Sequence, residues 1–314
     1  MGKLILNRVL IAIPTLLIVS LFVFALQHAL PGDPFLVIAG EERDPESIAR
    51  LRAIYRMDDP IIVQYFAWLV QVLQGEFGRS LRTGEPVLGL ILQKLPVTLQ
   101  LAIASMIVAM AIGLPAGIIA AVRKGTAVDY TASAVALSGL SIPNFWLGIV
   151  MILVFAVELR WLPASGYVPF FSDPLGAIET LIMPAIVLGT GLAAFIMRHT
   201  RSAMLEVLRS DYVRTARAKG LHEGVVINKH ALRNALIPVI TLSTILFGEL
   251  LAGAVLTEQV FTIPGFGKLI VDAVFNRDYG VVQGVVLCTA IGFIVMNLVA
   301  DMLYILVNPR LRGR

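Results

Sequence analysis

Long apolar runs recur along this chain, and they constrain its fold more than any other feature. A helix needs about 20 predominantly apolar residues to cross a bilayer. Apolar residues make up 58% of the 314 residues and charged residues only 15%, against about 45–50% and about 25% in soluble domains. We therefore predict an all-α integral membrane protein and exclude a soluble enzyme, a disordered chain and a nucleic-acid-binding module. Six transmembrane helices are expected, at residues 9–30, 97–122, 131–157, 181–197, 237–257 and 280–307.

The first apolar segment could be a signal peptide, because Lys3 and Arg8 precede it. Its apolar run is longer than the roughly 7–15 residues of a typical signal-peptide core, and no small-residue cleavage site follows it. We expect an uncleaved membrane anchor. A further apolar run at residues 61–73 is too short to span a bilayer, and an interfacial or buried position is expected for it.

The basic residues predict the orientation. With six spans, both termini share one side with the loops at residues 123–130 and 198–236, and these four segments carry most of the lysines and arginines. Cytoplasmic loops are enriched in Lys and Arg. Both termini and the long loop are therefore expected to lie in the cytoplasm.

The spans divide the chain into three parts. Residues 1–30 form the N-terminus and first transmembrane helix, residues 31–96 an extracytoplasmic segment, and residues 97–314 a five-helix core that includes the loop at 198–236. In the extracytoplasmic segment, a short amphipathic helix is expected to begin at Asp44-Pro45. The segment is interpreted either as a lid on the extracytoplasmic face of the membrane or as a contact for a substrate-delivery protein.

Several spans carry residues that favour close packing or bending. One face of the second span has small residues at helical spacing, which suits close helix–helix contact; they are Ala109, Gly113, Gly117 and Ala121. Proline kinks helices, and kinks are expected at Pro115, Pro143 and Pro184. The pattern Gly189-x-Gly191-x-x-Ala194 matches a dinucleotide-binding fingerprint, but it lies in an apolar span without a βαβ context. It is interpreted as helix packing.

The most informative stretch is the polar loop from Asp211 to Pro238. Ser210 or Asp211 is expected to cap a helix that runs to Lys219, and Gly220 supplies the left-handed residue that ends many helices. A second helix is expected from about Glu223 into the fifth span. Such a basic hairpin could rest on anionic lipid. Alternatively, small residues at positions 216, 218 and 220 would suit insertion into a groove on a protein partner.

This loop resembles the EAA loop of ATP-binding-cassette (ABC) importer permeases, in which a short coupling helix docks on an ATPase subunit. The resemblance rests on Thr215-Ala216 followed by Gly220. The family's usual proline is displaced to Pro238 and Thr215 replaces an alanine, a variant typical of the dipeptide/oligopeptide branch. Other landmarks of that branch are Pro31-Gly32-Asp33-Pro34, Gly75-Glu76-Phe77-Gly78-Arg79-Ser80 (with Glu76 for Asp), Pro264-Gly265-Phe266-Gly267, Arg277-Asp278-Tyr279 and Asn308-Pro309-Arg310.

The resemblance implies a type I importer permease of a bacterial inner membrane, which forms a pore with a second permease, as a heterodimer. Two ATP-binding subunits and an extracytoplasmic substrate-binding protein would complete the transporter. ATP and magnesium would bind the ATPase subunits, and this chain would hold no cofactor. Consistent with this, neither lysine that follows a glycine, Lys3 or Lys268, lies in a Walker A motif. The implied ATPase-coupling residues are Asp211, Tyr212, Arg214, Thr215, Ala216, Arg217, Ala218, Lys219, Gly220 and Leu221.

The implied substrates are di- or oligopeptides or a small peptide such as glutathione, and a haem or nickel-chelate importer is the alternative within this branch. Glu249, near the middle of the fifth span, is expected to face either the substrate pathway or a neighbouring helix, because a carboxylate at that depth is costly. Asn144 is a second pathway candidate, and Asp301 is expected to serve packing. The four histidines and Cys288 show no metal-ligand spacing.

A gradient-driven secondary transporter with Glu249 as ion carrier is the competing class. Secondary transporters often contain inverted repeats, and we find no matching halves. A membrane enzyme is disfavoured, because we find no nucleophile–base–acid set.

Overall fold

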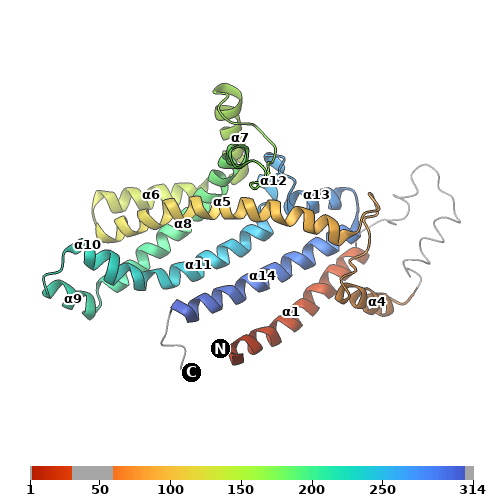
Figure 1. Ribbon diagram of the computed structural model, residues 1–314, viewed down its shortest axis with the longest axis horizontal. Helices are drawn as coiled ribbons and strands as arrows, with labels where there is room; N and C mark the ends of the chain where they lie inside the picture. Colours follow the sequence, from red (N-terminus) through yellow and green to blue (C-terminus); the bar gives the residue numbers. More distant parts are fainter. Residues whose placement is uncertain (1, 30–58, 308–314) are drawn as a thin grey trace. The chain divides into compact units, whose positions relative to one another are not determined.

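The computed structural model describes residues 2–29 and 59–307, and every regular element in these ranges is a helix. Three predicted features lie outside the described residues: the turn at residues 31–34, the helix expected to begin at residues 44–45 and the motif at residues 308–310. The elements (Figure 1) are α1 (Gly2–Ala29), α4 (Ile61–Leu73), α5 (Val87–Val122), α6 (Ala127–Ser141), α7 (Asn144–Met151), π-helical η1 (Ile152–Glu158), α8 (Pro174–Leu208), α9 (Asp211–Ala218), α10 (Glu223–Val225), π-helical η2 (Val226–Ala231), α11 (Leu232–Gly253), α12 (Val255–Val260), α13 (Phe266–Phe275) and α14 (Tyr279–Val307).

Four described helices are long and apolar enough to cross a membrane: α5, α8, the α10–α11 helix and α14. The bent pair formed by α6 with α7–η1 would make a fifth span if its two parts are counted together. The described apolar part of α1, Leu10–Ala25, is shorter than this criterion requires. The all-helical membrane fold is thus confirmed. The number of spans stays a prediction.

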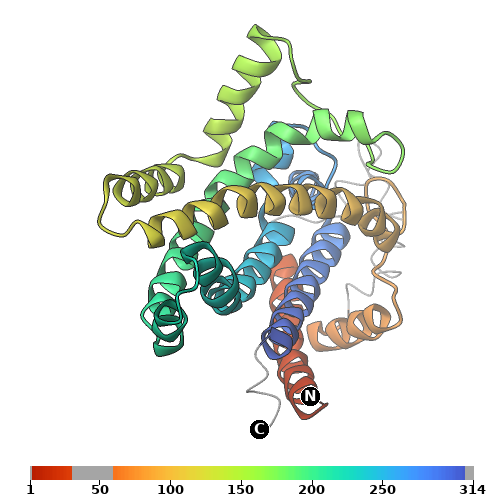
Figure 2. The ribbon, with the colours of Figure 1, turned by 60° about the vertical axis from the view of Figure 1, so that its left-hand side comes forward.

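The third predicted span is broken rather than kinked. α6 ends at Ser141 and α7 begins at Asn144 after Pro143, and the two parts meet at 93°. Figure 2 shows α7 and η1 leaving the direction of α6. Proline removes a backbone donor and restricts the residue before it to extended conformations. Ile142 is indeed extended, with φ −85° and ψ 121°.

The chain divides into two compact units, and the first comprises residues 1–96 and 264–294. In this unit α4 packs on α1. A separate apolar cluster joins the start of α5 to α13 and α14 through Val87, Ile91, Phe266 and Val281. Gly284 is needed for this packing, since a Cβ there would lie 2.5 Å from Val87 Cγ1.

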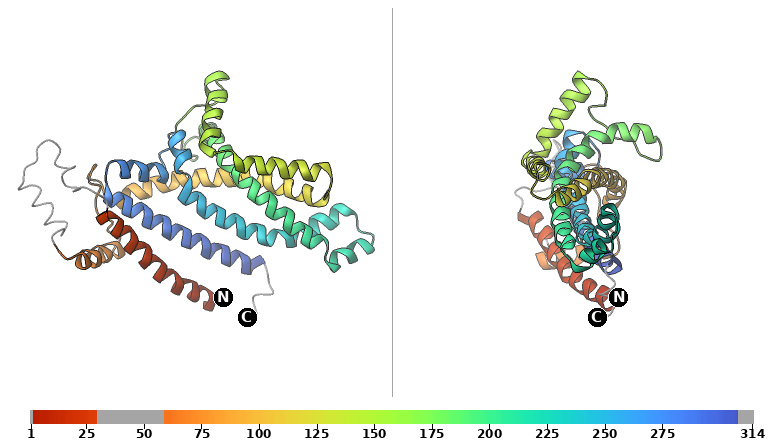
Figure 3. Two further views of the ribbon diagram at one scale, coloured as in Figure 1. Left: turned by 180° about the vertical axis from the view of Figure 1, so that it is seen from behind. Right: turned by 90° about the vertical axis from the view of Figure 1, so that its left-hand side faces the viewer.

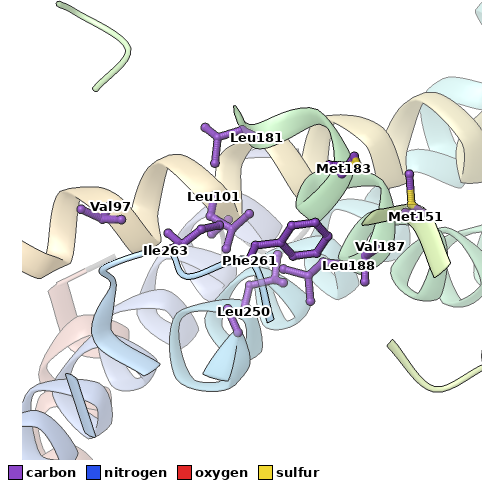
Figure 4. Packing of buried hydrophobic residues seen from close by; sticks show 12 residues of the cluster. Val97, Leu101, Met151, Leu181, Met183, Val187, Leu188, Leu250, Phe261 and Ile263 are labelled. Carbon is purple, nitrogen blue, oxygen red and sulfur yellow. The ribbon is translucent and has the colours of Figure 1, made fainter. Parts of the chain in front are cut away.

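The second unit comprises residues 97–263 and 295–314. Its largest apolar cluster joins α5, α8 and the segment around α12 (Figure 4), with Leu101, Met183, Phe261 and Ile263 almost fully buried. Buried polar groups accompany it. The carboxylate of Glu258 in α12 is 0% exposed and accepts a hydrogen bond of 2.7 Å from the Thr98 hydroxyl.

The small-residue face predicted on the second span packs closely against α8. A Cβ at Gly113 would lie 2.6 Å from the carbonyl oxygen of Ala193, and one at Gly117 would lie 2.6 Å from that of Met197. Gly189, from the pattern that mimics a dinucleotide fingerprint, also serves packing, because its Cβ would lie 2.7 Å from Val108. The interpretation of both features as helix contacts is confirmed.

An ion pair fixes α6 to α8 near the loop at residues 123–130. Arg201 of α8 donates two hydrogen bonds, of 2.7 and 2.8 Å, to the carboxylate of Asp129. The Asp129 side chain is only 4% exposed and also accepts from the backbone N–H of Gly125. A buried charge is stable only when it is paired and hydrogen-bonded. This pair therefore holds the start of α6 in place.

Candidate functional site: the helical hairpin and its attachment

Residues 211–231 form a helical hairpin between α8 and α11 (Figure 3). Helix α9 starts after Ser210, as predicted, although the Ser210 side chain makes no capping bond. Val213 and Ala216 of α9 are buried, and they pack with Val226 of η2 beside Val207 and Leu208. This cluster gives α9 one apolar face against its own chain and leaves the opposite face open.

α9 ends in a Schellman motif built on Gly220. The Gly220 N–H donates to the Arg217 carbonyl at 2.9 Å, and the Leu221 N–H donates to the Ala216 carbonyl at 3.4 Å. Gly220 has φ +77°, a conformation that costs other L-residues about 1–2 kcal/mol. The predicted left-handed glycine at this position is confirmed.

The second arm of the hairpin begins at Glu223, as predicted. The His222 side chain caps it by accepting a hydrogen bond from the Gly224 N–H at 3.2 Å. Arg217 and Glu223 form an ion pair of 2.6 Å across the glycine turn. Hydrogen bonding to Glu223 raises the pKa of Arg217 above its ordinary value, so the guanidinium stays charged. From Glu223 the helix continues through η2 into α11 without a loop.

The predicted coupling residues divide between two faces. Ala216 is 6% exposed and faces the apolar cluster, so the expectation that it would be available to a partner is wrong. The exposed set comprises Asp211, Tyr212, Arg214, Thr215, Arg217, Ala218, Lys219, Gly220 and Leu221. Three of its four charged side chains are paired within the hairpin, because Arg214 bonds to Asp211 and Arg217 to Glu223. The open face is therefore polar and largely preorganised.

A hydrogen bond that the sequence did not reveal ties α9 directly to α11. The Asn234 side-chain amide donates to the Tyr212 hydroxyl at 2.8 Å. Tyr212 belongs to the predicted coupling motif, whereas Asn234 lies in the second predicted helix and carries no predicted role. No local pattern identifies such a partner, since the two residues meet only after the hairpin has folded.

The two pathway candidates lie at different places in the fold. Glu249 is exposed on α11, and Asn144 is exposed at the first position of α7, directly after the break. No hydrogen bond joins these two side chains in the described part of the chain. Asn144 lies near α8, because a Cβ at Gly191 would be 3.6 Å from its Oδ1 atom. Asp301, expected to serve packing, is half-buried in α14.

Two motifs far apart in the sequence meet in the first unit. The hydroxyl of Ser80 donates to the carboxylate of Asp278, which also accepts from the Leu81 N–H at 3.2 Å. Asp278 is 4% exposed. The segment after α4 is thus clamped to the start of α14. Among the described residues, no cluster of three or more His, Cys, Asp or Glu side chains could hold a metal ion.

Comparison with known proteins identifies the family. Residues 113–313 match the family described as binding-protein-dependent transport system inner membrane component, and residues 1–102 match its N-terminal counterpart. The dipeptide transport system permease protein DppB of Escherichia coli is 43% identical, with 100% of both chains covered. The di/tripeptide transport system permease protein DppB of Pseudomonas aeruginosa is 46% identical, covering 98% of this chain and 97% of the relative.

A solved structure supports the fold independently. The MetNI methionine ABC transporter, in an inward-facing conformation, has a chain that matches 70% of this chain and 96% of its own length, with a TM-score of 0.57 at 22% identity. The two chains therefore share a fold over the matched region. The chain belongs to the family of binding-protein-dependent transport system inner membrane components, and it is a transport permease rather than an enzyme.

Proposed function

We propose that this chain is the pore-forming permease of an ATP-driven importer of di- or oligopeptides, or of a small peptide such as glutathione. The relatives named for dipeptide and di/tripeptide transport, which match over nearly their whole length, support this substrate class. A metal chelate or haem carried by the same machinery is the alternative. The partners are a second permease, two ATPase subunits and an extracytoplasmic binding protein.

In the proposed topology, six spans place both termini and the 198–236 segment in the cytoplasm of a bacterial cell, and residues 31–96 outside. α1 is the first span and the broken α6–α7 pair the third. The excess of Lys and Arg in the assigned cytoplasmic segments supports this orientation. ATP and magnesium act on the ATPase subunits.

The observation that carries the proposal is the hairpin at residues 211–231, with one face packed on its own chain and the other open. In the proposed mechanism the open face of α9 docks in a groove of an ATPase subunit. Closure of the ATPases on ATP displaces α9, and the displacement passes into α11. ATP binding at the partner supplies the differential free energy that any such change requires.

Glu249 and Asn144 are proposed to line the substrate pathway. A carboxylate exposed on the surface of a membrane span is costly in lipid, by about 2.5–3.5 kcal/mol on insertion scales for Asp. The exposure of Glu249 on α11 therefore favours a position facing the pathway, where it would attract a peptide's ammonium group. If Glu249 instead carried ions in a gradient-driven transporter, uptake would stop with an uncoupler and continue without ATPase subunits.

The test replaces small residues of α9 in the complete transporter. Gly220→Leu is expected to leave ATP hydrolysis running while uptake is lost, but it also strains the left-handed turn. Ala218→Leu avoids this strain, because Ala218 is exposed and helical. The matched control is Ala127→Leu, at another exposed helical alanine of the assigned cytoplasmic side. Normal uptake per ATP with both hairpin variants, at normal membrane levels, would reject this hairpin as the coupling element.

A further inference from the structure

α4 exposes an apolar stripe that no other described residue covers. Ile62, Phe66, Val70 and Leu73 are 70%, 58%, 52% and 79% exposed. Their spacing places them on one side of a helix that turns every 3.6 residues. α4 contains no charged residue. An exposed apolar face of this kind marks an interaction surface.

The other sides of α4 show how it is held. Towards α1, the Tyr65 hydroxyl and Ser20 Oγ are 2.9 Å apart, and the Phe24 ring lies 5.4 Å from Tyr65 and 5.8 Å from Trp68, measured between centroids. Figure 1 shows α4 beside α1. A third side carries the exposed Gln71 and, at the C-cap, Gln74, whereas Gln64 is buried and donates to the Asp59 carbonyl at 2.8 Å. α4 therefore has an apolar side, a side packed on α1 and a polar side.

The contacts with α1 indicate the depth of α4. Ser20 and Phe24 lie in the last turns of the apolar part of α1, Leu10–Ala25. The neighbouring Ile18, Leu21 and Phe22 of α1 are also exposed, so the apolar surface continues from α1. α4 itself would reach about 20 Å at 1.5 Å per residue, too short for a hydrocarbon core of about 30 Å. Trp and Tyr are enriched at this boundary of the bilayer.

We propose that α4 lies at the extracytoplasmic interface of the membrane, with its apolar stripe in the acyl region of the lipid and the exposed Gln71 and Gln74 towards water. This inference rests on the proposed topology, in which α1 spans the membrane and α4 is extracytoplasmic. Attachment to α1, rather than positive charge, anchors the helix, because α4 has no Lys or Arg. The segment after α4 is then fixed at both ends, by lipid at α4 and by the Ser80–Asp278 clamp.

The test compares two neighbouring exposed positions of α4 in the complete transporter, reconstituted in lipid nanodiscs. The background carries Cys288→Ser, which removes the only cysteine of this chain, and serine replaces the cysteines of the other subunits. A nitroxide is attached at Val70→Cys or at Gln71→Cys. Its collision rates are measured with oxygen, which concentrates in lipid, and with a water-soluble nickel chelate.

The label at position 70 is expected to collide more with oxygen than with the chelate, and the label at position 71 the reverse. A label at Leu73→Cys repeats the lipid-facing result if the variant at position 70 fails to assemble. Equal access of the chelate to both positions would overturn the proposal by placing α4 in water. Shielding of position 70 from both reagents would overturn it in favour of a protein partner.

The same preparations separate this inference from the proposed function. ATP-dependent peptide uptake is measured on the Cys288→Ser background before labelling. Loss of ATP dependence with a lipid-exposed label at position 70 would reject the coupling mechanism and leave the position of α4 intact. Normal ATP-dependent uptake with a water-exposed label at position 70 would reject the interfacial position of α4 and leave the coupling mechanism intact.

Discussion

The close contact of α5 with α8 at Gly117 predicts that Gly117→Ala destabilises the protein. A Cβ at Gly117 would lie 2.6 Å from the carbonyl oxygen of Met197 and 2.6 Å from Thr200 Cβ. Neither atom is the end of a flexible side chain, and Thr200 is fully buried. The alanine can be accommodated only if the two helices move apart along the contact.

The expected destabilisation is about 1–3 kcal/mol, the usual range for overpacking a close contact. Alanine also favours a helix over glycine by about 1 kcal/mol, which would mask part of the loss. Gly292→Ala in α14 corrects for this term, because nothing lies within 4 Å of the Cβ it adds. The difference between the two variants therefore isolates the steric effect.

Both free energies of unfolding can be measured by titrating the purified chain in mixed micelles with a denaturing detergent. We expect Gly117→Ala to unfold at lower denaturant than Gly292→Ala. If the two variants were equally stable, the helices would not approach as closely as described, and the reasoning would be refuted.

Three further substitutions test other contacts. Arg201→Gln leaves the Asp129 carboxylate with the Gly125 N–H as its remaining donor, so a loss of stability is expected, limited because Arg201 is partly exposed. In the same unfolding titration, adding Asp129→Asn should restore part of this loss, and strictly additive losses would contradict the pairing. Ser80→Ala removes a bond to a buried carboxylate, worth about 1.5–3 kcal/mol, and should speed proteolysis of residues 75–86, whereas unchanged cleavage would argue against the clamp. Tyr212→Phe keeps the ring but loses the bond to α11, so uptake per ATP should fall while ATP hydrolysis continues; an unaltered ratio would exclude a role in transmission.

Local patterns predicted those elements whose signals are local. The apolar run at residues 61–73 coincides with α4, and the predicted last span begins within one residue of α14. Gly220 ends α9 as predicted, since a left-handed residue is a property of the chain itself. By contrast, α5 and α8 extend well beyond their apolar parts, through Lys94 and Arg198. Backbone hydrogen bonds do not depend on the polarity of the side chains, so a helix can continue past its apolar residues.

Features that depend on distant contacts were missed. Pro143 predicted a bend, but not one of 93°, because the direction of α7 is set by packing on α8 and α12. The Tyr212–Asn234 and Ser80–Asp278 bonds join residues whose partners cannot be read from either segment alone. Small size alone grouped Ala216 with Ala218 and Gly220 as docking residues, whereas the helical period buries Ala216 beside Val213.

The attachments of α9 determine how a displacement could reach the proposed pathway. The apolar cluster around Val213 holds α9 against η2 and the end of α8, and the bond to Asn234 joins α9 to the start of α11. Because η2 continues into α11 without a loop, both attachments connect α9 to that helix. From Asn234 to Glu249 the helix runs about 22 Å at 1.5 Å per residue. Pro238 interrupts the hydrogen-bond ladder early on this path, and prolines are common sites of helix bending. In the proposed mechanism, a movement of α9 would therefore tilt α11 about Pro238 and shift Glu249 sideways, rather than push the helix along its axis.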